Sequence, residues 1–429
     1  MTDTPLTGGE RDLLLHLLDL PTAGPLETGG DTSSLRLWEA QSAYAEAAAA
    51  LGFETVRHGP AEPSAIERED VPLAVRRAAE EVPGFLKSQP NLVLRLGPAL
   101  PRRATIMFNV HLDTVAGWEP PRFDGTLFHG RGAIDAKGPA VALLAGLRAA
   151  IAAEPALGRD TGVIIQAVAG EEGGAMGTFG TRPLVEEGYV GRLNVFCEPT
   201  GLRYLPRSTA SMTACVRVRG RDSIDDMPEA GHNASVLLGF LAQHLAQALP
   251  DTGTDGRACV AGLRTGDMHN RVYGEGQLFL NLSYGSVATG RAVREKLTEA
   301  FDEGLDAFTE RFGGLHDFAL TAAEARSVTA LEWHKKDLPA LRNTDPWAEC
   351  LFGEAAGIDR WPDELSAFTC DAIWMNGVPG TYTAVCGPGD LQENNAHAAG
   401  EHADLGELEE FASRIGRLVT AFSRSWSQH

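Results

Sequence analysis

Between about residues 90 and 200 the chain alternates short apolar runs with stretches of helical periodicity, and this alternation limits its fold more than any other feature. The runs with the length and apolarity of buried strands are NLVLRLG, ATIMFNV, GVIIQAVA and LNVFC. The stretches with helical character are GPAVALLAGLRAAIAAEP and GTRPLVEEG. Strands that alternate with helices along a chain form mostly parallel sheets covered by helices. The sequence therefore predicts an α/β domain.

Polar residues follow several of these runs where each predicted strand ends. His111 and Asp113 come directly after ATIMFNV, Glu171 and Glu172 follow GVIIQAVA, and Glu198 follows LNVFC. In extended chain, side chains two residues apart point to the same side, so His111 and Asp113 can act together. Functional sites of open α/β sheets are built at the carboxyl ends of strands. A strand end with two ordinary polar residues is the alternative for this stretch taken alone.

Two further residues extend this set. Asp135 lies in the turn GRGAIDAKG before a predicted helix, and His397 follows TYTAVC, another apolar run. Histidines and carboxylates match the ligands of Zn²⁺, with Co²⁺ or Mn²⁺ as other occupants, and a carboxylate can bridge two such ions. The adjacent acids Glu171 and Glu172 suggest that one binds metal while the other takes a proton from water. Each residue alone fits a structural role, but their joint placement favours a metal site.

The pattern changes between roughly residues 207 and 330. The segments that alternate like half-exposed strands are SMTACVRVRG, RACVAGLRTG and QLFLNLSYGS. The segments with helical periodicity are NASVLLGFLAQHLAQAL and AVREKLTEAFDEGLDAFTERF. We therefore expect a small inserted α+β domain at 207–330, with the two parts of the main domain at 1–206 and 331–429.

The acidic composition excludes several classes of partner. The chain has 58 acidic and 37 basic side chains, a formal charge of −21, which opposes binding to nucleic acid or to anionic membranes. Its longest apolar stretch is interrupted by Arg148 and is too short to span a bilayer. The N-terminal segment has no basic stretch before its apolar part, unlike a secretion signal. We expect no nucleic-acid or membrane partner, and a cytoplasmic location.

Several short motifs occur in the order and at the separations of a known family: HLDTV, GRGAIDAKG, AGEEGGAMGT, CEPT, PEAGHNAS and GPGD…AHAAGE. On these motifs the chain resembles the dinuclear zinc hydrolases that include aminoacylase, acetylornithine deacetylase, succinyl-diaminopimelate desuccinylase and glutamate carboxypeptidase. The resemblance implies a zinc-peptidase-like α/β catalytic domain, with a mixed or parallel sheet flanked by helices, interrupted by an α+β lid domain that commonly dimerises. It implies cleavage of an amide bond of a small N-acyl amino acid or dipeptide-like substrate, by a homodimer paired through the lid.

The resemblance also assigns metal ligands. It implies two zinc ions per chain. His111 and Glu198 would bind one ion, Glu172 and His397 the other, and Asp135 would bridge them.

Two more roles follow from the same resemblance. Glu171 would be the general base, and Asp113 would orient His111 from behind the metal. The implied mechanism is attack of a metal-activated water on the amide carbonyl, with Glu171 passing the proton to the leaving amine.

The lid motif departs from the family's pattern. The pattern G-x-x-x-H-S-S-x-P-x-x-G-x-N-A aligns with GRDSIDDMPEAGHNA, which places Ile224 where relatives have a histidine that polarises the substrate carbonyl. Loss of one such hydrogen-bond donor costs on the order of 10²- to 10³-fold in rate. His232 is the nearby substitute, with a surface residue at a helix start as the alternative. The functional alternatives are a specialised biosynthetic or carrier-bound substrate, or a metal-binding protein that no longer hydrolyses.

Substrate-binding positions also depart from the pattern. Asn270 matches a lid asparagine that contacts substrate, but Ser283 and Ile373 occupy positions where relatives often carry arginines for a substrate carboxylate. Arg271 is the nearby replacement, with an ordinary exposed strand arginine as the alternative. Because a buried carboxylate without a guanidinium partner is costly, we expect neutral or cationic substrates in preference to dianionic ones.

Overall fold

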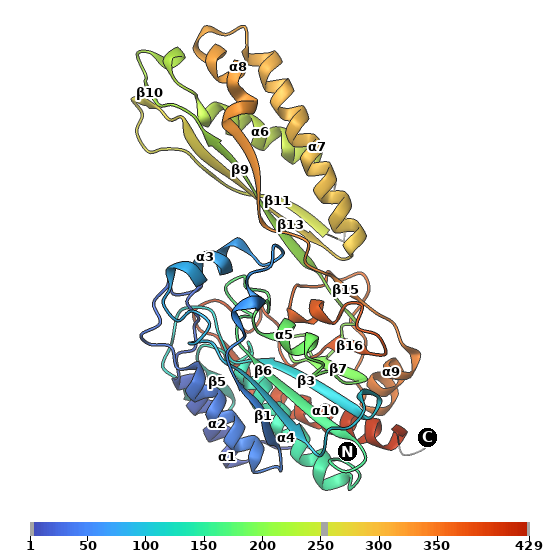
Figure 1. The fold of residues 1–429 in the computed structure, drawn as a ribbon. Coiled ribbons are helices and arrows are strands. Elements are labelled where there is room, and N and C mark those ends of the chain that lie inside the picture. Colours follow the sequence, from blue (N-terminus) through green and yellow to red (C-terminus); the bar gives the residue numbers. More distant parts are fainter. Residues whose placement is uncertain (1–3, 250–255, 427–429) are drawn as a thin grey trace. The chain divides into compact units, whose positions relative to one another are not determined.

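The computed structural model describes residues 4–249 and 256–426, which form two compact units. The first unit contains the described residues up to Ser208, together with Leu341–Leu365 and the residues from Cys370 onward. The second unit contains the described residues of Thr209–Ala340, together with Ser366–Thr369. Figure 1 shows the chain coloured from one end to the other. The insertion begins close to the expected residue 207 and ends later than expected.

A mixed sheet forms the centre of the first unit (Figure 1). Its six strands lie in the order β1 (Glu54–Gly59), β2 (Asn91–Leu96), β6 (Gly162–Val168), β3 (Thr105–His111), β7 (Leu193–Phe196) and β16 (Tyr382–Val385). Strands β6, β3, β7 and β16 run parallel, whereas β1 and β2 pair antiparallel at one end. The apolar runs of the sequence thus form neighbouring strands, and the predicted α/β class is confirmed.

Helices cover both faces of this sheet. The helices on the face with the larger core are α1 (Gly8–Asp19), α2 (Leu37–Ala49), α4 (Lys137–Ala153) and α10 (Leu405–Trp426). Leu92 and Leu94 of β2 point into that core. On the opposite face, Val93 and Val168 pack with Leu184 of α5 (Thr181–Glu186). The strands are buried on both faces, which explains their continuous apolar character.

Short elements complete the first unit. They are α3 (Leu73–Glu81), α9 (Pro346–Cys350), β4 (Arg122–Phe123), β5 (Leu127–His129), β8 (Arg207–Ser208), β15 (Leu341–Arg342) and β17 (His402–Asp404). Strand β17 pairs antiparallel with β5, and β5 pairs with β4. The pairing holds the segment that follows His397 close to the segment that precedes α4.

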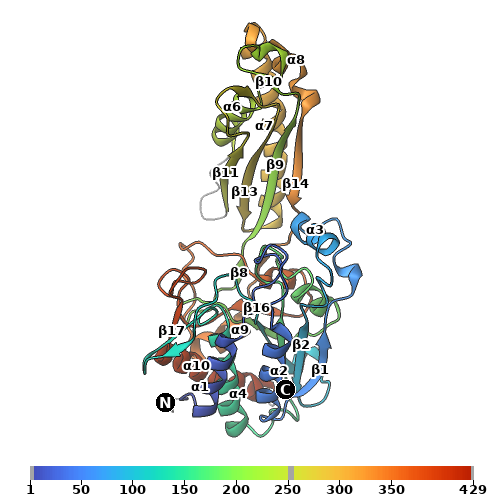
Figure 2. The ribbon, with the colours of Figure 1, turned by 90° about the vertical axis from the view of Figure 1, so that its left-hand side faces the viewer.

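The second unit is an antiparallel sheet with helices on one face. Its four strands lie in the order β11 (Gly256–Arg264), β13 (Glu275–Tyr284), β9 (Ala210–Arg219) and β14 (Thr329–Lys335). The helices are α6 (Ala234–Ala248), α7 (Val287–Phe312) and α8 (Ala319–Val328). Two short strands, β10 (Ser223–Ile224) and β12 (Arg271–Val272), pair antiparallel in a separate two-stranded sheet. Figure 2 shows the strands of this sheet side by side with α6 and α7 behind them. Alternate residues such as Ala214, Val216 and Leu280 are buried beneath these helices.

The expected domain boundary at residue 330 needs correction because it divides β14. Thr329 pairs with Val218 and Lys335 pairs with Thr213, so the whole strand belongs to the sheet of the second unit. The segment TALEWHK does not alternate cleanly between apolar and polar residues, since Trp333 is followed by two polar residues, His334 and Lys335, around a bulge. A later short segment also joins this unit, where the main-chain N–H of Thr209 donates to the oxygen of Phe368.

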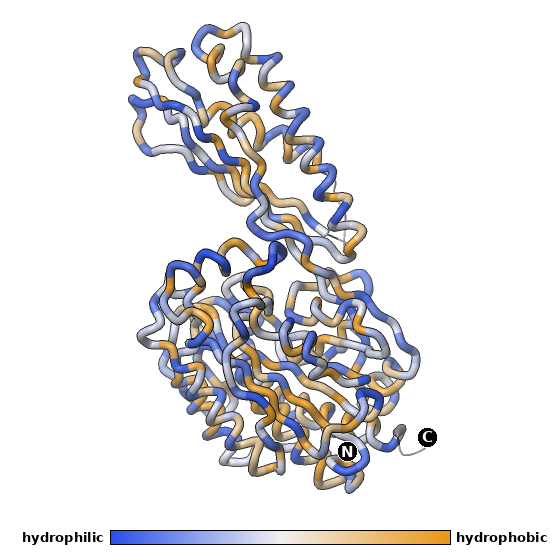
Figure 3. Tube along the Cα trace, viewed as in Figure 1, coloured by the Kyte–Doolittle hydropathy of each residue, from blue (hydrophilic) through white to orange (hydrophobic). Residues whose placement is uncertain are grey.

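Hydropathy follows the packing of the elements. In Figure 3 the strands of the first unit contain hydrophobic segments, whereas α7 changes repeatedly between hydrophilic and hydrophobic along its length. Helix α7 buries one face through Val293, Leu297, Ala300 and Leu305, as an amphipathic helix does. None of the helices within 4–249 and 256–426 combines the length and apolarity needed to cross a membrane.

Gly146 allows α4 and α10 to approach closely, and its replacement should destabilise the first unit. A Cβ at Gly146 would lie 2.5 Å from the oxygen of Ala412 and 3.1 Å from Cβ of Ile415. Gly146→Ala should therefore lower the free energy of unfolding by about 1–3 kcal/mol, because the helices must separate. Gly9→Ala, in the open first turn of α1, is the control and should change it by no more than about 1 kcal/mol. Equal thermal unfolding midpoints for Gly146→Ala and the parent would contradict this account.

Candidate active site

The predicted metal ligands meet at one edge of the sheet in the first unit. His111 is the last residue of β3, Glu171 and Glu172 follow β6, Glu198 follows β7, and His397 lies in the loop after β16. These four strands are parallel, so their carboxyl ends lie at the same edge. Residues far apart in the sequence are brought together by the topology of the sheet.

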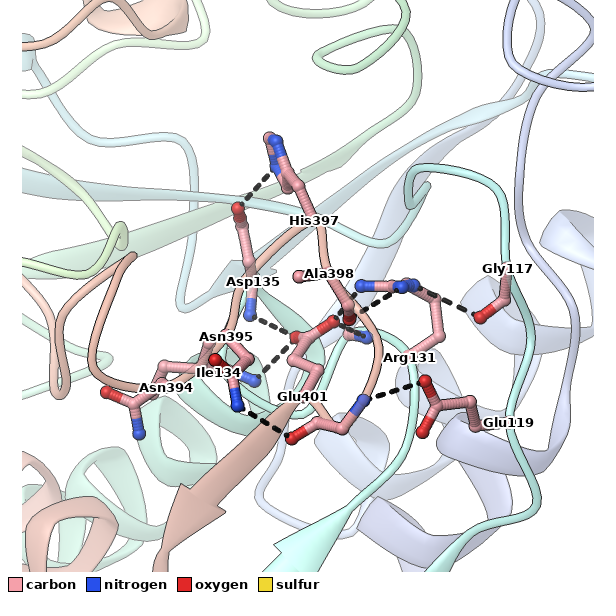
Figure 4. Close-up of polar contacts among 12 residues, drawn as sticks. Gly117, Glu119, Arg131, Ile134, Asp135, Asn394, Asn395, His397, Ala398 and Glu401 are labelled. Atoms are coloured by element: carbon pink, nitrogen blue, oxygen red, sulfur yellow. Dashed lines mark hydrogen bonds and ion pairs between the residues drawn. The ribbon is translucent and has the colours of Figure 1, made fainter.

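Asp135, in the turn before α4, lies between the two histidines. Its Oδ1 is 2.9 Å from Nε2 of His111, and its Oδ2 is 3.0 Å from Nε2 of His397, the contact drawn in Figure 4. His111 Nε2 also lies 3.6 Å from Oε2 of Glu198, and His397 Nε2 lies 3.0 Å from Oε1 of Glu172. The ligand atoms therefore form two groups that share Asp135, each within 4.8 Å. A carboxylate that bridges two ions requires this arrangement.

The cluster places several carboxylates where little water can solvate them, since Glu172 and Glu198 are buried and Glu171 is partly buried. Burial raises the pKa of Glu198, and it raises the pKa of Glu172 to about 7. Burial and the nearby charge of Glu198 raise the pKa of Glu171 well above its usual range. Buried carboxylates are costly unless positive charge stands close to them. Two divalent cations would supply that charge, so the donor set fits a dinuclear metal site.

The same carboxylates increase the proton affinity of both histidines. Hydrogen bonding to Asp135 and Glu172 raises the pKa of His397 to about 10. Burial lowers the pKa of His111, but the charge of Glu198 and the hydrogen bond with Asp135 outweigh it, and the pKa lies well above its usual range. A metal ion must therefore displace protons from the imidazoles when it binds.

Asp113 makes a different contact from the expected one. His111 Nδ1 lies 2.9 Å from the main-chain oxygen of Asp113, whereas the carboxylate Oδ1 is 3.7 Å away. The carboxylate Oδ2 instead accepts hydrogen bonds from the main-chain N–H groups of Gly170, at 3.0 Å, and Glu172, at 3.1 Å. The main chain of Asp113 thus orients His111, and its side chain fixes the turn that carries Glu171 and Glu172.

The predicted lid residues lie in the second unit. Ile224 is exposed on β10, opposite Arg271 on β12, and Asn270 is exposed in the turn before β12. The guanidinium of Arg271 forms an ion pair with Asp222 and lies over the ring of Tyr273. The roles of Asn270 and Arg271 in substrate binding stay predictions.

His232 is neither an available substitute for the lid histidine nor a surface residue. It is buried before α6, whose N-cap is Asn233. Its Nδ1 accepts a hydrogen bond from the main-chain N–H of Arg221 at 2.8 Å, so its Nε2 carries the proton and donates to Glu324 at 3.1 Å. Both ring nitrogens are occupied within the second unit, where His232 links the main chain at Arg221 to Glu324 of α8.

Sequence reasoning missed several buried charged residues around the ligand set. Glu401 is buried and accepts hydrogen bonds from Arg131 and from the turn before α4 (Figure 4). Asp371, two residues before Ile373, accepts a hydrogen bond from Thr181 at 2.6 Å, and burial raises its pKa to about 8. Arg131 lies in the motif GRGAIDAKG, and Glu401 lies in the motif GPGD…AHAAGE. The position of Glu401, four residues after His397, is the sequence feature that could have identified it.

A model of peptidase family M20/M25/M40 matches residues 107–421. The chain belongs to this family. Among curated proteins, a LysW-lysine/LysW-ornithine hydrolase of Aeropyrum pernix is 32% identical over 229 residues, which cover 52% of this chain and 59% of that protein. The match thus spans less than two thirds of the length of that relative.

Solved structures of peptidases have the same fold. Aminopeptidase PepT of Bacillus cereus superposes with a TM-score of 0.68 at 15% identity, over 98% of this chain and 99% of the other. A Bacillus subtilis peptidase of the family, described as dinuclear metal binding, gives 0.63 at 11% identity, over 96% and 97%. Family membership confirms the predicted relationship to the dinuclear zinc hydrolases.

Cobalt binding at this site should release protons and weaken as the pH falls. With its pKa at about 10, His397 carries a proton at neutral pH and must lose it to coordinate an ion. Each displaced proton should make the affinity rise about tenfold per pH unit between about pH 6.5 and 8. Calorimetric titration with Co²⁺ in two buffers of different ionisation enthalpy measures the number of protons. His397→Ala should release fewer, and identical heats in both buffers would contradict the expectation.

Proposed function

We propose that this chain is a metal-dependent amidohydrolase that removes an acyl or aminoacyl group from the nitrogen of a small amino-acid-like substrate. The observation that carries this proposal is the position of Asp135, with one carboxylate oxygen at His111 and the other at His397. Such a shared ligand serves two ions, and paired ions at the end of a sheet suit hydrolysis of an amide. Membership in the M20/M25/M40 family supports the same class of reaction.

We assign two divalent ions to the site, with zinc as the expected metal and cobalt or manganese as possible occupants. His111 and Glu198 would hold one ion, Glu172 and His397 the other, and Asp135 both. When bound, such ions lower the pKa of a coordinated water to about 7 and polarise the amide carbonyl.

Glu171 is placed to move protons. Its carboxylate lies within 4.8 Å of ligand atoms of His111 and Glu172, but neither ion is assigned to it. Because burial and Glu198 raise its pKa, the carboxyl can take a proton and hold it until the leaving amine receives it. Asp113 fixes the turn on which Glu171 stands.

Glu171→Gln should separate proton transfer from metal binding. The variant should keep both ions and lose about 10²- to 10⁴-fold in kcat on N-acetyl amino acids. Glu172→Gln, the same change one residue later, should instead lose one ion. Elemental analysis after dialysis and steady-state kinetics measure the two effects. Full turnover by Glu171→Gln, or loss of an ion from it, would remove Glu171 from the role of base.

The residues at the expected carboxylate-binding positions argue for substrates with little negative charge. Ser283 and Ile373 offer no positive charge, and Ile373 is fully buried. Arg271 is the remaining candidate to bind a single carboxylate, with Asn270 beside it, although Asp222 partly neutralises its charge. The formal charge of −21 adds a general repulsion of anions.

Matched N-acetyl and N-succinyl amino acids should therefore differ in kcat/KM. We expect higher values for the N-acetyl compounds, poor turnover of N-succinyl-diaminopimelate, and a lower value for N-acetyl substrates in Arg271→Ala. Asp222→Asn, which frees the guanidinium without removing it, is the control and should not lower kcat/KM. Faster turnover of succinyl compounds would refute the charge argument, and an unchanged Arg271→Ala would exclude that residue from substrate binding.

A second candidate substrate is LysW-linked lysine or ornithine. The relative from Aeropyrum pernix is named for these two substrates, and both amino acids are cationic, in agreement with the expected preference. Release of lysine from LysW-lysine, compared with release from N-acetyl-lysine, distinguishes the two candidates. Silence on both would favour the remaining alternative, a metal-binding protein without hydrolysis, because Ile224 cannot polarise a carbonyl.

We also propose that the second unit acts as a lid through which two copies of the chain pair. The α+β architecture of this unit, with one open sheet face and a long amphipathic helix, supports that role. We further propose a cytoplasmic location for the protein.

A further inference from the structure

Glu401 joins the two loops that carry Asp135 and His397. The residue is only 1% exposed. Its Oε1 accepts hydrogen bonds from the main-chain N–H groups of Ile134, at 3.0 Å, and Asp135, at 3.1 Å, and its Oε2 accepts one from Gly132, at 3.0 Å. Figure 4 shows this carboxylate beneath the contact between Asp135 and His397. One side chain thus holds the main chain of the turn that presents Asp135.

Arg131 completes the link from the other side. Its Nη1 donates to Oε2 of Glu401 at 2.7 Å, and its Nη2 donates to the main-chain oxygen of Ala398 at 3.0 Å. Arg131 is 6% exposed, so this is a buried, charge-assisted pair with strong hydrogen bonds. The pair therefore bonds to the turn before α4 and to the residue that follows His397.

The backbone around His397 needs such support. His397 has a φ of 63° and Asn395 a φ of 53°, both in the left-handed region. A side chain there costs on the order of 1–3 kcal/mol and persists only where the surroundings fix it. The hydrogen bond from Arg131 to Ala398 and the pairing of β17 with β5 are contacts that flank His397.

We propose that Glu401 is a positioning residue which, together with Arg131, fixes Asp135 between His111 and His397. The inference rests on the proposed function, because it concerns the ligands assigned there. Glu401 acts through the N–H of Asp135 and through Arg131, and it touches no substrate. Without it, the turn is free to move and the two oxygens of Asp135 no longer meet both histidines. Loss of a residue behind metal ligands typically lowers metal affinity by about 10- to 100-fold.

The test uses variants that keep the volume of the side chain. Glu401→Gln replaces one acceptor oxygen by an NH₂ group. This group faces N–H donors, so the hydrogen bonds that the replaced oxygen accepts are lost. Arg131→Lys keeps a positive charge but loses the fork that reaches Ala398, and it serves as a second route should Glu401→Gln not fold. Glu154→Gln is the matched control, because Glu154 is also mostly buried and pairs with Arg424 beyond the opposite end of α4.

The first measurement uses the metal-free protein. Hydrogen exchange should become faster at the N–H groups of Gly132, Ile134 and Asp135 in Glu401→Gln, and stay as in the parent in Glu154→Gln. Unchanged exchange in Glu401→Gln would overturn the proposal whether or not metal binds.

The second measurement uses Co²⁺ as the probe. Glu401→Gln should bind cobalt about 10- to 100-fold more weakly by chelator competition, with an altered visible spectrum of the bound ion. Arg131→Lys should change in the same direction, and Glu154→Gln should match the parent. Parental affinity and spectrum in Glu401→Gln would overturn the positioning role. If the parent itself bound no cobalt, the proposed function would fail, while the exchange comparison would still decide whether Glu401 fixes the turn.

Discussion

The structure around the site depends on how buried negative charge is balanced. Carboxylates converge at one edge of the sheet, and burial opposes their ionisation. Basic side chains therefore lie beside them, namely the two histidines and the buried side chains of Arg131 and Lys137. Arg131 pairs with Glu401, and Lys137 donates to the oxygens of Leu17 and Leu20 at the end of α1. Lys137 is only 1% exposed, and this burial lowers its pKa to about 7.

Two of the acids do not face the ligand atoms but hold main-chain N–H groups. Asp113 accepts from the turn that carries Glu171 and Glu172, and Glu401 accepts from the turn that carries Asp135. A turn has unpaired N–H groups, and a buried carboxylate satisfies them while fixing the direction of the next side chain. These two carboxylates thus hold the turns that carry Glu171, Glu172 and Asp135, the last two of which are proposed metal ligands.

The residues that follow the apolar strands could be predicted from the sequence, because hydrophobic patterning identifies the strands themselves. His111, Glu198 and Asp135 stand at ends and turns that hydrophobic patterning locates, and parallel topology then brings them together. The assignment of individual metal ligands came from the motifs shared with the family. The direction of the Asp113 carboxylate could not be predicted, and neither could the partners of the two His232 nitrogens. Each depends on hydrogen bonds between separate segments of the fold, and such short contacts are set by the exact tertiary geometry.

Glu171 bears on whether hydrolysis is retained despite Ile224. Among the described residues it makes no hydrogen bond or ion pair, although burial raises its pKa strongly. An acid in such a place destabilises the fold, and a protein that only binds metal needs the ligands but not this neighbour. A proton acceptor beside the ions is useful when a water must lose a proton and an amine must gain one. The position of Glu171 therefore favours an enzyme over a protein that only binds metal.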